Sequence, residues 1–451
     1  MLLLNRDQHP RNSANQRMNA AQNLLMQLYQ RLVSGRNTRA VLVVMLAWAL
    51  QFSCVVLSSV VVARYLGPHL FGTLNYATAL MGFAGTLAGF GLGSVVTREL
   101  MSAARPMGDV LGTALLVRAI TGATALCVLL AYLHFFEPNA MAVALVSVVG
   151  GVLLIDGSMI FDSSLQSQRA FGSSSGAKAV LAVNSLFLRV SLVLMGASLV
   201  YFVAIQYIEI LCYIAVFGWV TRKVLKGVKA GWDPVLARTL LRQGFPIMLS
   251  SFATVIYLRI DQVMIEHLLG SDALGRYSAG VKLAEVASFF PGIIAYVLFP
   301  TIVEAYKVSA EKAEIEAIKL YRLMYASGLA FSLFMTVAGE WLTHLLFGPA
   351  YQGAGPVLKV YVWSTVFVFL TIASQAQLLS QEKTTHVVAV RTAVGAVVNI
   401  ALNLLLIPRM GIVGAAWATV ISYGVAVFFF FDRKYSWPPV RSMLRALALP
   451  V

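Results

Sequence analysis

The stretch PIMLSSFATVIYLRIDQVMIEHLLGSDALGRYSAGVKLAEV, residues Pro246 to Val286, decides the fold. It predicts a membrane-spanning helix, a short turn and the start of a second span. Polar side chains recur in it at intervals of four, three and four residues, which places them on one face of a helix: Ser250, Thr254, Tyr257 and Asp261. A charged side chain at the centre of a bilayer costs about 2.5–3.5 kcal/mol. We therefore expect this face to line a water-filled cavity or to contact a partner helix.

The composition is that of a polytopic membrane protein. Of the 451 residues, 59% are hydrophobic and 12% are charged, whereas soluble domains carry about 25% charged residues. The net charge of +15 does not indicate nucleic acid binding, because the basic residues lie in short segments between apolar runs, where they indicate topology. The three cysteines lie inside apolar runs and the six histidines are scattered, so we expect neither disulfides nor a metal site.

Twelve apolar runs are long enough to cross a hydrocarbon core of about 30 Å, which takes about 20 helical residues. They predict an all-α polytopic membrane protein with twelve transmembrane helices. The runs cover residues 40–63, 73–97, 110–133, 139–162, 175–196, 199–220, 243–267, 277–303, 322–347, 357–380, 387–407 and 412–431.

The chain divides into two groups of six spans. A similar motif follows the first span of each group: LGPHLFG at Leu66–Gly72 and LGSDALG at Leu269–Gly275. Because both groups start on the same side of the membrane, the repeat is parallel, and we expect two pseudo-symmetric six-helix lobes around a central cavity. The predicted order is a polar tail (1–38), an N-terminal lobe (39–221), a basic linker (222–242), a C-terminal lobe (243–431) and a second tail (432–451).

The basic residues predict the orientation. Of the lysines and arginines, 26 fall on the side of the two termini and three on the opposite side: Arg64, Arg276 and Arg409. Because basic loops stay in the cytoplasm, both tails are expected there. The sequence contains no P-loop and no helical His-Glu-x-x-His motif. We therefore predict a transporter rather than an enzyme, without a cofactor, driven by an ion gradient or by the substrate's own gradient.

Four basic residues fall within predicted spans: Arg118, Arg189, Arg259 and Lys282. One interpretation is a cationic cavity that binds an anionic head group, since the planar guanidinium pairs two phosphate oxygens at once. The other is internal pairing. Lys282 is three residues from Glu285, and Arg259 has Glu209 or Asp156 as possible partners on other helices. Both interpretations stay open.

Four acidic residues also lie within predicted spans and are candidates for ion coupling: Asp156, Glu209, Asp261 and Glu285. Asp261 is the strongest of them because it ends the polar stripe. Its carboxylate could exchange a proton or help to bind sodium, or it could be a structural partner of a neighbouring arginine. Four glycines of the repeated motif are expected to permit tight turns that gate access: Gly67, Gly72, Gly270 and Gly275.

Several blocks resemble the polysaccharide transporter family within the multidrug/oligosaccharidyl-lipid/polysaccharide exporter superfamily. They are ARYLGPHLFGTLNYA (Ala63–Ala77), GFGLGSVVTREL (Gly89–Leu100), RIDQVMIEHLLGSDALGRYSAGVKL (Arg259–Leu283), LFGPAYQGAG (Leu346–Gly355) and NLLLIPRMGIVGAAWATVIS (Asn403–Ser422). Each block is degenerate alone, but together they follow one another in the family's order. Asp261 matches a position where the family usually has an acidic residue, whereas the resemblance assigns no role to Arg118 or Arg189.

The resemblance implies an alternating-access flippase for oligosaccharide repeat units linked to undecaprenyl pyrophosphate, in the bacterial inner membrane. It implies membrane lipid as surroundings, a polysaccharide polymerase and co-polymerase as possible partners, and H⁺ or Na⁺ as possible coupling ions. Two other functions stay open. A multidrug exporter of the same superfamily would affect drug resistance and leave surface glycan unchanged. A membrane scaffold for a polymerase would tolerate neutralisation of the intramembrane charges but not substitution of the helix-packing glycines.

Overall fold

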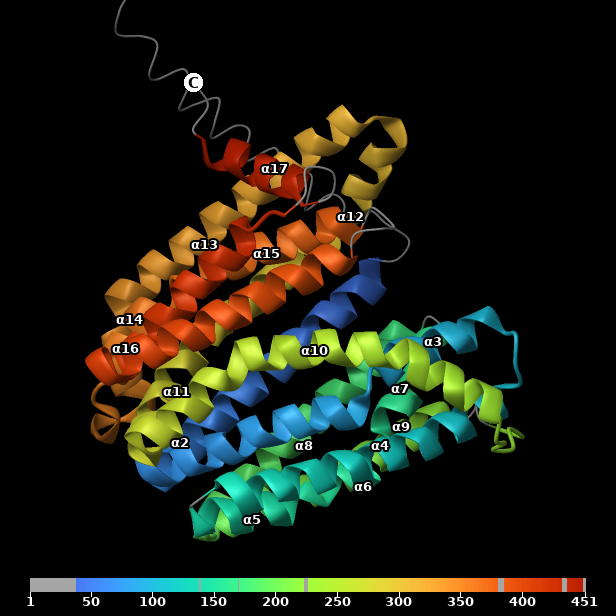
Figure 1. Cartoon of the computed structure of the whole chain (residues 1–451), viewed down its shortest axis with the longest axis horizontal. Coiled ribbons are helices and arrows are strands. Elements are labelled where there is room, and N and C mark those ends of the chain that lie inside the picture. Colours follow the sequence, from blue (N-terminus) through green and yellow to red (C-terminus); the bar gives the residue numbers. More distant parts are fainter. Residues whose placement is uncertain are drawn as a thin grey trace, which may run out of the picture.

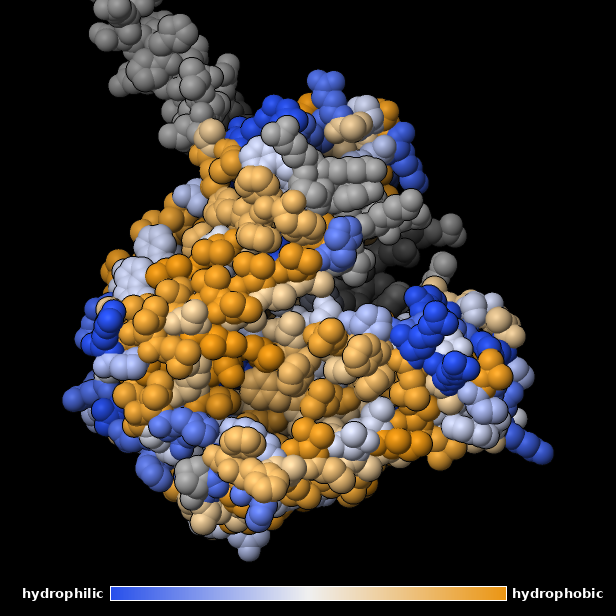
Figure 2. Space-filling model, viewed as in Figure 1, coloured by the Kyte–Doolittle hydropathy of each residue, from blue (hydrophilic) through white to orange (hydrophobic). Residues whose placement is uncertain are grey.

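The computed structural model describes residues 38–137, 139–168, 170–222, 226–379, 385–431 and 436–448, and all regular elements in these ranges are helices (Figure 1). The predicted N-terminal tail lies outside the described residues except for Thr38. On the face shown in Figure 2, an apolar band crosses the molecule and hydrophilic residues gather towards its two ends. The prediction of an all-α polytopic membrane protein is confirmed.

The N-terminal group of helices follows in chain order. It consists of α2 (Thr38–Gly89), α3 (Leu92–Ser102), α4 (Met107–Phe136), α5 (Ala140–Gly150), α6 (Val152–Ile155), α7 (Ser158–Ser167), α8 (Phe171–Leu194) and α9 (Leu199–Thr221). The C-terminal group consists of α10 (Pro234–Leu269), α11 (Ser271–Glu285), η1 (Val286–Ser288), α12 (Phe289–Val308), α13 (Ala310–Phe347), η2 (Pro349–Tyr351), α14 (Ala354–Tyr361), α15 (Ser364–Leu379), α16 (Thr385–Phe428) and α17 (Trp437–Leu447). In Figure 1 the two groups form separate bundles, with α10, α11 and part of α2 between them.

Ten helical segments among the described residues are long and apolar enough to cross a membrane. Two of them leave the helical conformation internally, α2 at Gly67 and α16 at Gly411. In α16 the chain reverses at Gly411. Asn399 Nδ2 donates to Ser422 Oγ at 3.2 Å, whereas these residues would lie about 35 Å apart in a straight helix. Counting each broken helix as two spans would give twelve, and that number stays a prediction.

The first glycine has the same backbone conformation in both copies of the repeated motif. Gly67 has φ 71° and ψ 172°, and Gly270 has φ 84° and ψ 173°. Residues with a Cβ rarely adopt this positive φ, so glycine is required at both positions. Each glycine ends one helix and lets the next one start at the following residue. The repeat seen in the sequence is therefore also a repeat of structure.

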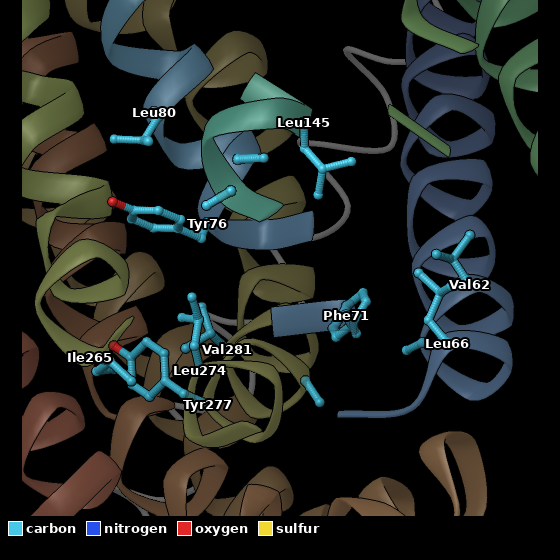
Figure 3. Packing of buried hydrophobic residues seen from close by; sticks show 14 of the residues in the cluster. Val62, Leu66, Phe71, Tyr76, Leu80, Leu145, Ile265, Leu274, Tyr277 and Val281 are labelled. Atoms are coloured by element: carbon cyan, nitrogen blue, oxygen red, sulfur yellow. The ribbon is translucent and has the colours of Figure 1, made fainter. Parts of the chain in front are cut away.

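The largest buried cluster lies where the two groups of helices meet (Figure 3). Its members include Leu66 and Phe71 from α2, Leu145 from α5, and Leu274 and Tyr277 from α11. Within a bilayer, close packing rather than removal from water drives such association. Tight fit between small and large side chains therefore holds the groups together at this end.

Helix α10 starts inside the predicted basic linker. Asp233 caps it, since Asp233 Oδ1 accepts hydrogen bonds from the backbone N–H groups of Val235 (2.8 Å) and Leu236 (3.1 Å). Leu236 and Leu240 are fully buried in a cluster with Val95 and other residues of the N-terminal group. The first turns of α10 thus pack on the N-terminal group, and the helix then continues through Pro246 towards the C-terminal one. The predicted lobe boundaries stay predictions.

The predicted C-terminal tail contains α17. Met443 of this helix is buried against α13, and Arg445 Nη1 lies 2.6 Å from Glu314 Oε1 of α13. This part of the tail is therefore docked on the C-terminal group.

Candidate functional site

The intramembrane charges are arranged in pairs. On the N-terminal side, Arg118 Nη2 of α4 lies 3.6 Å from Asp156 Oδ2 at the end of α6, and Arg118 Nη1 donates to the carbonyl of Leu153 at 3.1 Å. The Arg118 side chain is 6% exposed and that of Asp156 33%. This arrangement matches the internal-pairing interpretation of Arg118 better than a free cation in a cavity.

Arg189 and Glu209 form a second pair, between α8 and α9. Arg189 Nη2 lies 3.0 Å from Glu209 Oε1, and Ser185 joins the two, since it accepts from Arg189 Nη1 and donates to Glu209 Oε1, both at 2.6 Å. Pairing of Arg259 with Glu209 or Asp156, the possibility left open by the sequence, is not what the structure shows.

The third group, which we call the C-lobe cation cluster, consists of Arg259, Lys282 and Glu285 on α10 and α11. Glu285 lies 3.8 Å from Arg259 Nη1 and 3.3 Å from Lys282 Nζ. One carboxylate thus pairs with two cations, so these three side chains alone carry one positive charge in excess. The three side chains are 23–32% exposed, so this group is accessible as well as cationic. The sequence-predicted pair of Lys282 and Glu285 is present.

Asp261 lies beside this cluster and is not paired with a cation at salt-bridge distance among the described residues. Its side chain is buried. Tyr277 Oη donates to Asp261 Oδ2, and the N–H of Gln262 donates to Asp261 Oδ1 at 2.8 Å. Tyr277 in turn packs edge-on against Tyr361 of α14, with ring centroids 6.3 Å apart. The carboxylate is therefore held by hydroxyl and amide donors in a tyrosine-rich pocket.

Arg118→Met is expected to lower the thermal stability, because it removes the cation from Asp156. The cost should be about 1–3 kcal/mol, below the 3–5 kcal/mol of a fully buried pair, since Asp156 is partly exposed. The double variant Arg118→Met/Asp156→Asn should recover part of the loss, as seen in the melting temperature of the purified protein. If the double variant lost as much melting temperature as the two single variants together, the two side chains would not be coupled.

Two of the predicted gating glycines, Gly72 and Gly275, form a close contact between the two groups of helices, which we call the glycine seam. A Cβ on Gly72 would lie 1.8 Å from the carbonyl oxygen of Ser271, and a Cβ on Gly275 would lie 1.9 Å from that of Pro68. Pro68 and Ser271 are equivalent positions of the repeat, so the contact is reciprocal. Gly67 and Gly270 lie in the turns, as predicted. The prediction of turns at Gly72 and Gly275 is wrong, because both lie inside helices, α2 and α11.

Two further contacts flank the glycine seam. Arg64 donates to the carbonyls of Leu345 and Leu346 (2.6 Å to the latter) at the end of α13, where the helix dipole favours a cation. His267 Nε2 lies 3.8 Å from Glu137 Oε2 at the end of α4, and the Glu137 side chain is 3% exposed. Both contacts join the N-terminal group to the C-terminal one.

The sequence interpretation missed Tyr277, Arg64 and the contact of Glu137 with His267. A signal for Tyr277 is present: Asp261 precedes Gly270 by nine residues and Tyr277 follows it by seven. Residues at similar distances from a tight turn between antiparallel helices lie side by side. Arg64 and Glu137 carry no such signal, because their partners are remote in the chain.

Two helical lobes that meet in a reciprocal contact, with paired charges inside the apolar band, define a multi-pass membrane transporter. The family model described as "Polysaccharide biosynthesis protein" matches residues 38–306, more than half of the chain, and the MatE model matches residues 246–405. The chain belongs to the polysaccharide biosynthesis protein family, and with it to the polysaccharide transporters of the multidrug/oligosaccharidyl-lipid/polysaccharide exporter superfamily. The resemblance noted in the sequence is confirmed.

Similar proteins include the uncharacterized membrane protein MJ1068 of Methanocaldococcus jannaschii, 26% identical over 48% of this chain and 44% of that protein. Another is the probable low-salt glycan biosynthesis flippase Agl15 of Haloferax volcanii, 23% identical over 80% of this chain and 76% of that protein. The match thus spans less than half of MJ1068. Among solved structures, the lipid II flippase MurJ in an inward closed conformation superposes with a TM-score of 0.72, at 13% identity, over 90% of this chain and 91% of that one. This likeness shows the shared fold.

Proposed function

We propose that this protein is a flippase that moves oligosaccharide repeat units, linked to undecaprenyl pyrophosphate, across the bacterial inner membrane for surface polysaccharide assembly. Membership of the polysaccharide biosynthesis family and the similarity to a probable glycan flippase support the class of substrate. Both termini would lie in the cytoplasm, as the 26 to three distribution of basic residues predicts. A polymerase and co-polymerase as partners remain predictions.

The C-lobe cation cluster is the observation that carries this proposal. Arg259 and Lys282 share the single carboxylate of Glu285, while the nearby Asp261 is held by Tyr277 and the Gln262 N–H. An anionic head group would therefore meet two cations that have one carboxylate between them. A pyrophosphate would complete the pairing of these cations. Arg118 and Arg189 each have a carboxylate of their own, and would act mainly on the stability of the N-terminal lobe.

Alternating access would use the two lobes as moving parts. The glycine seam would close the outer side while the substrate head enters from the cytoplasm, and its separation would release the head outside. Asp261 would couple this motion to H⁺ or Na⁺, because it is a buried carboxylate on the helix that also carries Arg259. Glu285 would contribute to the same coupling through its two cations.

Complementation of a deletion strain tests the function. The strain should accumulate lipid-linked oligosaccharide on the cytoplasmic leaflet and lose its surface polysaccharide, and the native gene should restore it. Arg259→Gln/Lys282→Gln should restore less than about a tenth of wild-type glycan, a loss of about 1.4 kcal/mol in recognition. The measurements are glycan quantification and analysis of extracted lipids.

Lys319→Gln is the matched control, because Lys319 also pairs with a glutamate three residues away, Glu316, but on α13 outside the cluster. It should restore glycan fully. Full restoration by the double variant as well would favour the scaffold function. The MatE match to residues 246–405 makes a multidrug exporter the second candidate, and altered drug tolerance with intact surface glycan would establish it instead.

A further inference from the structure

An apolar groove of about 300 Å³ lies between α2, α4 and α10. Twelve side chains line it, all apolar except the hydroxyl of one tyrosine: Leu80, Phe83, Ala84 and Leu87 from α2, Ala125, Val128, Leu129 and Tyr132 from α4, and Phe252, Ile256, Ile260 and Val263 from α10. Val128 is 51% exposed, so the groove opens to the outside of the bundle. The surface over α10 is largely apolar in Figure 2.

The depth of the groove follows from its position along α10. The stretch from Phe252 to Val263 covers about 16 Å along the axis of α10, and Val263 lies about 10 Å before the turn at Gly270. If α10 is taken as perpendicular to the membrane and the turn at Gly270 as one face of a hydrocarbon core of about 30 Å, the groove extends from about 10 Å to about 27 Å below that face. It therefore passes the midplane, at about 15 Å, whereas the acyl chain of a phospholipid stays in its own leaflet.

The groove also adjoins the C-lobe cation cluster. Arg259 lies next to Ile260 in the chain and one turn from Ile256, but it turns towards Glu285 of α11 rather than into the groove. Arg259, which would bind an anionic head group, and the groove thus lie on neighbouring faces of α10 at the same depth. One molecule with an anionic head and a long apolar chain could occupy both.

We propose that this groove holds the polyisoprenyl chain of the lipid-linked substrate during transport, and this proposal rests on the proposed function. A chain longer than one leaflet needs an apolar path past the midplane when its head changes sides. Because surrounding lipid is as apolar as the groove, shape and packing rather than hydrophobicity select the chain. The two walls belong to different lobes, so the groove changes width as the lobes move.

Photolabelling tests this assignment directly. The protein in lipid nanodiscs is irradiated with a diazirine-bearing undecaprenyl phosphate and, separately, with a diazirine-bearing phosphatidylglycerol, and labelled peptides are mapped. The polyprenyl probe should label groove residues of α4 and α10. Val128→Trp, which fills the groove from its exposed rim, should reduce this labelling about tenfold or more. Leu116→Trp is the control, since Leu116 lies on the same helix, is also 51% exposed and is outside the groove.

Equal labelling by the two lipids, or labelling that Val128→Trp leaves unchanged, would overturn the assignment and identify the groove as an ordinary lipid contact. Transport in proteoliposomes gives the second readout. Val128→Trp should slow transfer of an oligosaccharide on an undecaprenyl carrier and spare the same oligosaccharide on a geranyl carrier. Wild-type protein that transfers neither would contradict the proposed function, whereas the labelling result still decides the groove.

Discussion

Gly72→Ala should prevent the two lobes from closing at the glycine seam and should reduce glycan export at least about tenfold. The new Cβ would lie 1.8 Å from the Ser271 carbonyl oxygen and 2.7 Å from its carbon. Both atoms are backbone, so the helices themselves must separate. A shift of 1.4 kcal/mol in the balance between closed and open states is enough for a tenfold effect. Spin labels at His134 and Asp272 would measure the distance between the lobes, and surface glycan would measure export.

Gly85→Ala is the matched control. Gly85 lies in the same helix, and a Cβ there would meet nothing within 4 Å, so both substitutions have the same effect on helix propensity. Gly275→Ala should reproduce the defect of Gly72→Ala, because it opens the same contact from the other lobe. The two together should be less than additive, since they separate one pair of helices. Normal export by Gly72→Ala would exclude closure of this seam from the transport cycle.

Asp261→Asn should abolish gradient-driven transport, with a loss of about a hundredfold, or about 2.7 kcal/mol. The amide keeps the size of the carboxylate and can still accept a hydrogen bond from Tyr277. It cannot bind a proton or attract a cation in the same way, so coupling is lost while the fold remains. Transport would be measured in proteoliposomes with a pH gradient and, separately, with a sodium gradient.

Asp162→Asn controls for the loss of a buried carboxylate as such. Asp162 is 7% exposed and Asp261 is 4% exposed, but Asp162 pairs with Lys178 at 2.7 Å in the N-terminal lobe. The control should transport normally under both gradients. If Asp261→Asn kept wild-type rates and the same dependence on the gradient, Asp261 would be a structural residue, held by Tyr277 and the Gln262 N–H.

The sequence allowed the charged residues to be located in the membrane but not their partners to be assigned. Lys282 and Glu285 could be paired from their spacing, because three residues bring side chains together on one helix. Arg259 could not, since its partner depends on how α10 and α11 pack. Its spacing from Gly270 gives a partial signal: Arg259 precedes this turn by eleven residues and Glu285 follows it by fifteen. Arg118 and Asp156 are 38 residues apart, and only the packing of α4 on α6 joins them.

The glycines of the repeated motif also divide into positions that could be predicted locally and positions that depend on packing between the lobes. The pattern correctly predicted turns at Gly67 and Gly270, because turn formation is local and requires positive φ. The role of Gly72 and Gly275 could not be predicted without the arrangement of the lobes, since each contacts a helix of the other lobe. The break within α16 at Gly411 was also accessible, because apolar runs on both sides are each long enough to cross a membrane.

The glycine seam resembles the interface of a symmetric homodimer. Because both halves belong to one chain, equivalent positions can carry different residues. Arg64 and His267 occupy such positions, each three residues before the turn glycine of its motif. Arg64 binds the end of α13, and His267 lies against Glu137 at the end of α4. The guanidinium of Arg64 donates to two backbone carbonyls, whereas the imidazole of His267 faces a single carboxylate. A structurally symmetric junction is therefore held by chemically different contacts on its two sides.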